Sequence, residues 1–449
     1  MKTAVVVIVD GVNQKSFEKL RKLGKIPFID ELSKESIEFK RCISVFPSAT
    51  VSGHASIATC VYPAHHGLVG QSWFDRKTGE FIGYDFELTL PDNWIDASTR
   101  LSDEHLTAKT CYEILRQRGV KTFSVDLIKR GADYNFSFIK PGLDRGVKFA
   151  RFLMFLRRFA GHSFKTRKLS KLLFPIFQNE IAVMNTLKAI KIGCRFGIVW
   201  FMETDMASHL FSPESFEGIH GREFIYDSLE DAMRDVDEEV EKLYKGILRI
   251  TGNKPILALV TDHGQSKLKE GEKYHVDLVE VLAEFGLNAF TNLDLEEYEK
   301  RTKKVGEVVI AVSGPRMAHV YSLRRKDDVL DALKSLECID QIIDRDRKVF
   351  YYDCEEFKLG EIDEVLGDNY PRARERVEGL IQNERCGDFV ITAKEGYEFE
   401  KANYKGAHGS LLYDDSVGFA MIRCGKNLEL PECMITDVVK FVLNELIKQ

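Results

Sequence analysis

The sequence lacks several features that mark whole classes of protein. Its nine cysteines are scattered over 449 residues without a Cys-x-x-Cys pair, which disfavours a thiolate zinc site or a thioredoxin motif. No apolar run reaches the roughly 18 residues of a membrane-spanning helix. The apolar run Ala4–Val9 is short and meets Asp10 directly, which disfavours a secretory signal. Because an odd, dispersed set of cysteines is typical of reduced thiols, we expect a cytoplasmic protein.

Neither sign of charge dominates the chain. It has 64 basic and 70 acidic residues, a net charge of −6, which excludes a dedicated nucleic-acid binder by global charge. A composition of 44% hydrophobic and 30% charged residues indicates a globular enzyme rather than a disordered or collagen-like chain. Residues 145–179 differ, with nine basic residues, no acidic one, and interleaved Phe and Leu. Such a segment could bind an anionic membrane surface or substrate phosphates. Alternatively, it could be a helix whose charged face is exposed to solvent.

Short apolar runs alternate with longer segments of helical periodicity. The predicted strands are Val5–Val9, Thr122–Leu127, Phe196–Phe201, Ile256–Thr261, Val308–Val312, Phe389–Thr392 and Gly418–Ile422. The predicted helices are Asp103–Arg118, Tyr226–Ile250, Val276–Phe285, Asp327–Leu336, Pro371–Gln382 and Ile435–Lys448. Continuous apolar runs are typical of strands buried on both faces. The alternation therefore predicts an α/β fold with a doubly wound, mostly parallel sheet and helices on both faces.

The length fits one large α/β domain with an additional cap. We predict a catalytic core over residues 1–286 and 401–449, in which residues 75–190 form a partly irregular insertion. Residues 287–400 mix charge-rich helices with short strands, and we predict an inserted α+β cap there.

The strand ends contain residues suited to metal binding. Asp10 follows the first strand, Asp205 and His209 follow the third, and Asp262 and His263 follow the fourth. In open α/β sheets, ligands bind at the carboxyl ends of the strands. Residues four apart share one helix face, so Asp205 and His209 could hold one ion. Taken alone, however, each of these residues or pairs is also common in turns or on the protein surface without binding a metal.

His408 lies in the sequence Gly406-Ala407-His408-Gly409, where the glycines allow a tight turn. Imidazoles combined with carboxylates suit zinc or a similar transition metal better than magnesium or calcium.

Thr50 is the candidate nucleophile, in the segment Phe46-Pro47-Ser48-Ala49-Thr50. A helix is predicted over Ala55–Val61, and a hydroxyl near its start would lie beside free amides that can hold a phosphate. A metal would lower the pKa of this hydroxyl. The alternative from this segment alone is an ordinary threonine N-cap.

These motifs resemble those of the type I phosphodiesterase/nucleotide pyrophosphatase family of the alkaline phosphatase superfamily. The motifs are Val9-Asp10-Gly11, Phe46 to Thr50, Tyr62-Pro63-Ala64-His65-His66-Gly67, Glu203-Thr204-Asp205 with His209, Thr261-Asp262-His263-Gly264 and Gly406 to Gly409. They occur in the family's order. The resemblance implies an alkaline-phosphatase-like fold and a hydrolase of small anionic phosphoesters, with nucleotides among the candidate substrates.

The resemblance also implies a site for two divalent metal ions. Asp205, His209 and His408 would hold one ion, and the other ligands are Asp10, Asp262, His263 and the Thr50 hydroxyl. Zinc is the expected metal, with manganese or iron as alternatives, and the expected intermediate is a phospho-threonine.

Three positions depart from the family pattern and are our candidates for substrate binding. Val51 replaces an aromatic residue, Gln71 replaces an asparagine, and Trp200 replaces a tyrosine. Alternatives with the same site are a phosphomonoesterase, a phosphonoacetate-type hydrolase or a phosphosugar mutase. A phosphomonoesterase needs extra positive charge, which Arg41 or a residue of the cap could supply. A non-catalytic metal-binding protein is a further alternative. Four further histidines without a matched role either pack or orient ligands: His54, His65, His66 and His275.

Overall fold

The computed structural model describes residues 2–84, 100–136, 179–216, 228–291, 308–400 and 404–447. The basic stretch, apart from Asn179, lies outside these residues, as does much of the predicted insertion at 75–190. Within the described ranges, no helix combines the length and the apolar character needed to cross a membrane.

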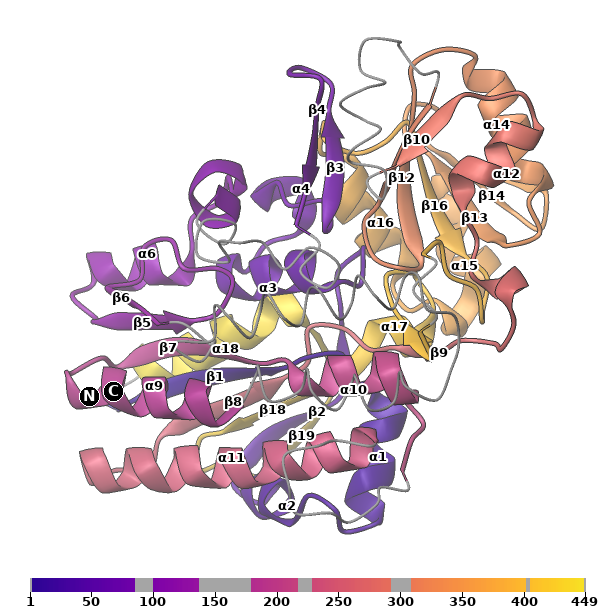
Figure 1. Ribbon diagram of the computed structural model, residues 1–449. Helices are drawn as coiled ribbons and strands as arrows, with labels where there is room; N and C mark the ends of the chain where they lie inside the picture. Colours follow the sequence, from indigo (N-terminus) through magenta and orange to yellow (C-terminus); the bar gives the residue numbers. More distant parts are fainter. Residues whose placement is uncertain are drawn as a thin grey trace, which may run out of the picture.

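An eight-stranded sheet forms the centre of the molecule (Figure 1). Its strands in spatial order are β19 (Leu428–Met434), β2 (Ser36–Ile43), β18 (Val417–Arg423), β8 (Ile256–Val260), β1 (Ala4–Val9), β7 (Phe196–Phe201), β5 (Thr122–Val125) and β6 (Tyr134–Asn135). β18 is antiparallel to both of its neighbours, and the other neighbouring pairs are parallel. The predicted mostly parallel sheet is confirmed.

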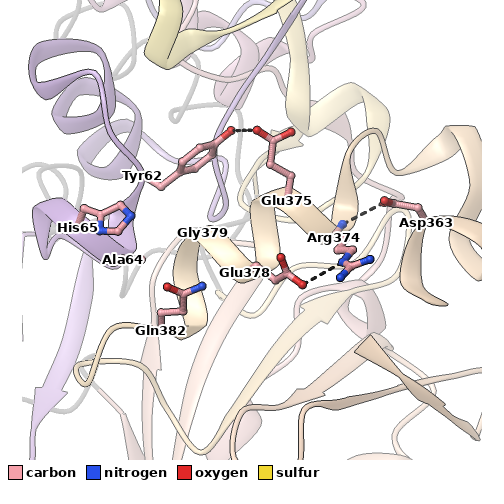
Figure 2. A pocket seen from close by; sticks show the side chains of 9 residues that line it. All are labelled: Tyr62, Ala64, His65, Asp363, Arg374, Glu375, Glu378, Gly379 and Gln382. Atoms are coloured by element: carbon pink, nitrogen blue, oxygen red, sulfur yellow. Dashed lines mark hydrogen bonds and ion pairs between the residues drawn. The ribbon is translucent and has the colours of Figure 1, made fainter. Parts of the chain in front are cut away.

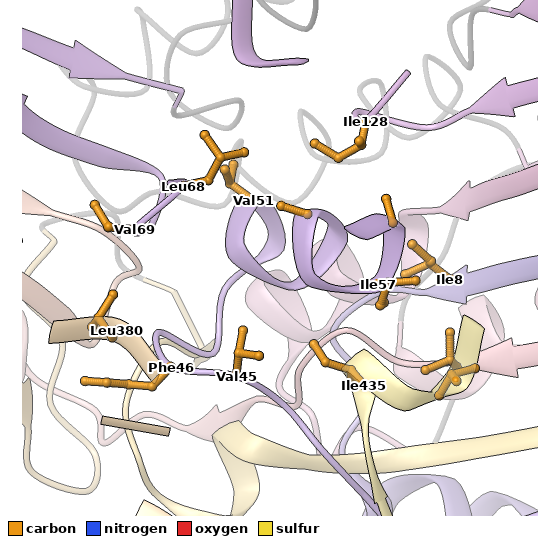
Figure 3. Packing of buried hydrophobic residues seen from close by; sticks show 14 of the residues in the cluster. Ile8, Val45, Phe46, Val51, Ile57, Leu68, Val69, Ile128, Leu380 and Ile435 are labelled. Atoms are coloured by element: carbon orange, nitrogen blue, oxygen red, sulfur yellow. The ribbon is translucent and has the colours of Figure 1, made fainter. Parts of the chain in front are cut away.

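Helices cover both faces of this sheet, because the strands are apolar on both sides. The side chains of β1 alternate between two hydrophobic clusters: Ala4, Val6 and Ile8 lie in one, and the odd-numbered valines lie in the other. The first cluster includes residues of α3 (Thr50–Thr59), α6 (Cys111–Gln117) and α18 (Ile435–Ile447). The second includes residues of α1 (Gln14–Lys22), α2 (Pro27–Ser33), α9 (Asn179–Lys191) and α11 (Leu229–Thr251). Figure 3 shows Ile8 of β1 near Ile57 of α3 in the first cluster. The fold is therefore doubly wound, as predicted.

A seven-stranded sheet lies beside one end of the central sheet (Figure 1). Its spatial order is β10 (Ala289–Thr291), β11 (Val308–Val312), β12 (Met317–Ser322), β16 (Phe389–Ala393), β13 (Ile339–Asp344), β14 (Val349–Tyr352) and β15 (Glu355–Lys358). Among the described residues, the α-helices of this part of the sequence are α12 (Leu278–Glu284), which precedes β10, and α14 (Lys326–Ser335), α15 (Ile362–Leu366) and α16 (Ala373–Ile381). All seven strands fall within the segment expected to be the cap, whose boundaries stay a prediction.

Shorter elements lie between these larger ones along the chain. They are α4 (Pro63–His66), β3 (Ser72–Asp75), β4 (Glu80–Gly83), α10 (Glu203–Phe211), β9 (Ser266–Lys267), β17 (Gly406–Ala407) and α17 (Tyr413–Ser416). β3 with β4, and β9 with β17, form two small two-stranded sheets. Ser72 Oγ donates a hydrogen bond to the carbonyl of Val312 at the end of β11, which ties β3 to the seven-stranded sheet.

Two element predictions were wrong. The single helix predicted over Asp103–Arg118 is a short π-helix, Leu101–His105, followed by α6. The helix is interrupted because α6 begins with a capping box at Thr110. The Thr110 side chain accepts a hydrogen bond from the backbone amide of Glu113, and the Glu113 side chain accepts one from the backbone amide of Thr110. The helix predicted from Ala55 begins earlier, at Thr50. β2 and β19 were not predicted, because their apolar and polar residues alternate instead of forming continuous apolar runs.

Candidate metal centre and active site

Five predicted ligands follow the carboxyl ends of three neighbouring strands. Asp10 follows β1, Asp205 and His209 lie on α10 after β7, and Asp262 and His263 follow β8. Because β1 lies between β7 and β8, the loops meet, and all five side chains are buried. His209 Nε2 is 3.3 Å from Asp205 Oδ2. His263 Nε2 is 3.3 Å from Asp10 Oδ1 and 3.4 Å from Asp262 Oδ2.

His408 follows β17, which pairs with β9 beside the same loops. Its Nε2 atom lies 4.0 Å from Asp205 Oδ1, and its ring stacks on His263 with centroids 3.9 Å apart. Three sets of potential metal ligands have donor atoms within 4.8 Å of one another: Asp205, His209 and His408; Asp10, Asp205 and His263; and Asp10, His54 and Asp262. The structure thus brings together the six predicted carboxylate and imidazole ligands.

The chemistry of this cluster fits divalent cations. Among the described residues, Oδ1 of Asp10 and Oδ2 of Asp262 are buried acceptors without a hydrogen-bond donor. Buried acceptors of this kind are costly, and a cation between them would satisfy both. Mixed carboxylate and imidazole sets are typical of zinc-like metals.

The carboxyl groups of the cluster differ in their affinity for protons. Burial and the neighbouring Asp262 and Asp205 raise the pKa of Asp10 well above its usual value. Burial opposes ionisation of Asp205 too, but His209 and the neighbouring imidazoles hold the pKa of this carboxyl below its usual range. Proximity to His263 and to His54 likewise lowers the pKa of Asp262, against the effect of burial. At Asp205 and Asp262, the effect of neighbouring charges on the pKa therefore outweighs the effect of burial.

The three imidazoles of the predicted set are oriented by backbone carbonyls. Nδ1 of His209 donates to the carbonyl of Gly406 at 2.8 Å, and Nδ1 of His408 donates to that of Ser48 at 2.9 Å. Nδ1 of His263 donates to the carbonyl of the following residue at 3.0 Å. A metal-binding histidine is commonly oriented in this way, with its second nitrogen directed at the ion.

Thr50 is the first residue of α3 and faces this cluster. Its Oγ1 atom lies 3.2 Å from His263 Nε2, and the residue is 7% exposed. The preceding Ala49 is extended and provides no side-chain cap, so Thr50 begins the helix and is not its N-cap. α3 also packs tightly on the metal loop, since a Cβ at Gly53 would lie 2.8 Å from Asp262 Cβ. The hydroxyl therefore sits beside first-turn amides that have no partner inside the helix.

From the sequence, His54 was left as a residue that either packs or orients a ligand, and Asp126 was not singled out. His54 Nδ1 lies 2.5 Å from Asp126 Oδ1, and Nε2 lies 3.4 Å from Asp262 Oδ2. Burial would lower the pKa of His54, but Asp126 and Asp262 raise it to about 9. The position of Asp126 could have indicated its role, because β5 ends at Val125 and Asp126 is therefore another aspartate directly after a strand.

The three substrate-binding candidates have mainly internal contacts. Trp200 is 5% exposed, and its indole Nε1 donates to Asp10 Oδ2 at 2.6 Å. Val51 is buried in the hydrophobic cluster, near Leu68 in Figure 3. Gln71 is buried, and its carbonyl accepts a hydrogen bond from the amide of Tyr84. Their roles toward a substrate stay predictions, and Trp200 has a clear second role as a partner of Asp10.

The remaining candidates lie outside the metal-ligand sets. His66 Nε2 hydrogen-bonds Ser56 Oγ at 2.9 Å inside the core, and burial lowers its pKa to about 3. His275 pairs with Glu398. Arg41 forms an ion pair with Glu432 of β19, so its guanidinium is already engaged by a carboxylate.

A surface cavity of about 340 Å³ lies between α4 and α16 (Figure 2). Tyr62 donates to Glu375 across it at 2.6 Å, and His65 lines it. It shares no lining residue with the metal-ligand sets, and its polar groups pair with one another.

The comparisons with known proteins agree on one family. Residues 4–411 match the type I phosphodiesterase / nucleotide pyrophosphatase family. A curated relative is an uncharacterized pyrophosphatase/phosphodiesterase of Schizosaccharomyces pombe, 30% identical over 95 residues. That match covers 21% of this chain and 19% of the relative.

Solved structures show the same fold. The chain is similar to murine ectonucleotide pyrophosphatase/phosphodiesterase 5, solved as an inactive form in complex with AMP, with a TM-score of 0.64 and 15% identity. The human protein gives a TM-score of 0.62 and 14% identity. Both alignments cover 99% of this chain and 95% of the other. Since the family match extends over most of the 449 residues, the chain belongs to the type I phosphodiesterase/nucleotide pyrophosphatase family.

Proposed function

We propose that this protein is a phosphodiesterase or pyrophosphatase that uses two divalent metal ions and Thr50 as its nucleophile. The observation that carries the proposal is the position of Thr50, whose hydroxyl is 3.2 Å from His263 Nε2 at the start of α3. Asp205, His209 and His408 would hold one ion, and Asp10, Asp262 and His263 would hold the other with Thr50. Bound zinc ions would supply Lewis acidity and lower the pKa of the threonine hydroxyl.

The chain's own residues account for the two steps of the reaction. The Thr50 hydroxyl releases its proton to solvent and Oγ1 attacks phosphorus. A bond forms from Oγ1 to phosphorus while the bond to the leaving-group oxygen breaks, and that oxygen takes up a proton from solvent. A water molecule then attacks phosphorus and gives up a proton, while the bond to Oγ1 breaks and Oγ1 takes up a proton, which restores the threonine hydroxyl. The amides at the start of α3 would bind the phosphoryl oxygens and stabilise their charge.

We also propose a nucleotide substrate for this site. The support is the family and the AMP complex of the murine relative. The monoesterase alternative needs positive charge from Arg41 or from a residue of the cap, and the ion pair of Arg41 with Glu432 speaks against Arg41 in that role. The expected cytoplasmic location stays a prediction.

Activity on an aryl phosphodiester tests the proposal. Thr50→Ala should lower kcat by at least about 1,000-fold, because removal of a nucleophile leaves only binding and electrostatic effects. Thr50→Ser is the matched control, because it keeps a hydroxyl and should retain measurable turnover. Full activity of Thr50→Ala would refute the assignment, and a large preference for an aryl monoester would favour the alternative.

A further inference from the structure

Two fully buried arginines extend toward the metal loops from the part of the chain that forms the seven-stranded sheet. Arg316 precedes β12, Arg376 lies on α16, and both side chains are 0% exposed. A guanidinium stays charged in proteins and is costly to bury unless its donors meet acceptors. The hydrogen-bond acceptors of these two guanidinium groups therefore indicate which segments the buried arginines hold in place.

Arg316 holds the loop that contains His408. Its Nη1 atom donates to Asp415 Oδ1 at 3.0 Å, and its backbone amide donates to the carbonyl of His408 at 2.9 Å. Asp415 Oδ2 accepts both the amide and the hydroxyl of Ser410, at 2.9 and 2.6 Å. The two residues thus fix the loop immediately before and after Gly409.

The same aspartate also holds the loop that follows His263. The carbonyl of Asp415 accepts the amide of Gly264 at 2.8 Å, and its carboxylate accepts the hydroxyl of Ser266. Removal of one partner from such a buried charged pair leaves an uncompensated charge and is strongly destabilising. The pair of Arg316 and Asp415 therefore connects two separate metal loops.

Arg376 holds the loop that leads to Thr50. Its Nη2 atom donates to Ser48 Oγ at 2.8 Å, and Nη1 donates to the carbonyl of Leu411 at 3.2 Å. The carbonyl of Ser48 accepts Nδ1 of His408, as described above. One guanidinium thus joins the segment before the nucleophile to the segment after the metal ligand.

The acceptors of Arg376 are otherwise neutral. In the part of the chain that the structure describes, no carboxylate lies within ion-pair distance of its guanidinium, and its other acceptors are the carbonyls of Val45 and Pro371. Burial lowers the pKa of Arg376 to about 9, and Tyr62 and then Asp415 oppose this shift. Asp415 thus pairs directly with Arg316 and acts on Arg376 only over a longer distance.

We propose that Arg316 and Arg376 are positioning residues, which lock the His408 loop against the Thr50 loop and so set the geometry of the metal centre. This inference rests on the proposed function, because it concerns the same metal ligands. It makes the seven-stranded sheet a structural part of the active site, in addition to any contact it has with substrate.

The test measures zinc binding, which needs no turnover. Zinc is titrated into the metal-free protein against a chromogenic chelator, and His408→Ala identifies the binding step that uses His408. Arg376→Met should weaken that step by roughly 10- to 100-fold, the range seen when a partner of a metal ligand is lost. Arg374→Met is the matched control, since Arg374 is an exposed residue of α16 that pairs with Glu378. This variant should bind zinc at both steps with an affinity within twofold of the wild type.

A double-mutant cycle separates positioning from a general loss of structure. If Arg376 acts through Ser48, then Ser48→Ala should weaken the same step, and combining it with Arg376→Met should add little. Arg376→Lys, which keeps the positive charge and a single donor nitrogen, should restore part of the affinity. Unchanged zinc affinity in a folded Arg376→Met protein, or full additivity in the cycle, would overturn the proposal.

If Arg376→Met does not fold, Ser48→Ala and Asp415→Asn decide in its place, and wild-type affinity in both would refute the inference. A wild-type protein that binds two zinc ions but cleaves no phosphodiester would refute the proposed function and leave the positioning result valid. A wild-type protein that binds no divalent metal would refute both.

Discussion

Trp200 provides the sharpest test of how the metal centre is built. Its indole Nε1 donates to Asp10 Oδ2 at 2.6 Å, and both residues are buried. Trp200→Phe keeps an aromatic ring and removes this donor. If Trp200 instead serves as a platform for a substrate base, the same change should alter KM and leave metal binding unaffected.

The expected magnitude follows from the charge of the acceptor. A hydrogen bond to a charged group contributes about 1.5–3 kcal/mol, which corresponds to a roughly 10- to 150-fold change in an equilibrium constant. The bond also lowers the pKa of Asp10, which burial and its acidic neighbours raise. Its loss makes the carboxyl group easier to protonate, and a proton competes with the metal. We therefore expect zinc affinity at the Asp10 site to fall by roughly 10- to 150-fold.

The assay is competitive zinc titration at constant pH, with thermal unfolding of the metal-free protein measured in parallel. Trp73→Phe is the matched control, because Trp73 is fully buried and its indole nitrogen has no hydrogen-bond partner among the described residues. Both variants lose similar volume, so both should lower the melting temperature, but only Trp200→Phe should weaken zinc binding. Equal zinc affinities in the two variants would refute the reasoning.

Two further predictions concern other buried groups. Asp126→Asn removes the charge that fixes His54 beside Asp262, so zinc affinity at that site should fall by about tenfold in the same titration, and an unchanged affinity would rule out this role. His319 is buried, and burial lowers its pKa to about 4. The neutral imidazole therefore contributes to the free energy of unfolding above pH 6.5, and this contribution is lost as the pH falls toward 4. Urea unfolding at pH 7 and pH 5 should show that His319→Gln removes about 2 kcal/mol of the pH dependence, and an identical pH dependence would contradict the assignment.

Much of the fold was predictable because it depends on short-range periodicity. β1 is a continuous apolar run and is buried on both faces, as its sequence indicates. β2 was missed because charged residues interrupt its apolar ones. The early start of α3 at Thr50 was also missed, because neither Ala49 nor Thr50 provides the side-chain cap that usually marks a helix start.

The sequence by itself determined which residues end the strands and which pairs share a helix face. Asp205 and His209 illustrate this, because four residues along α10 place both on one side whatever packs against them. Only the tertiary structure decided which side chains hold these ligands in place. Asp126 reaches His54 across 72 positions, and Arg376 reaches Ser48 across 328. No local periodicity encodes these contacts, because the first depends on how α3 packs on the central sheet and the second on how α16 packs beside the loop before α3.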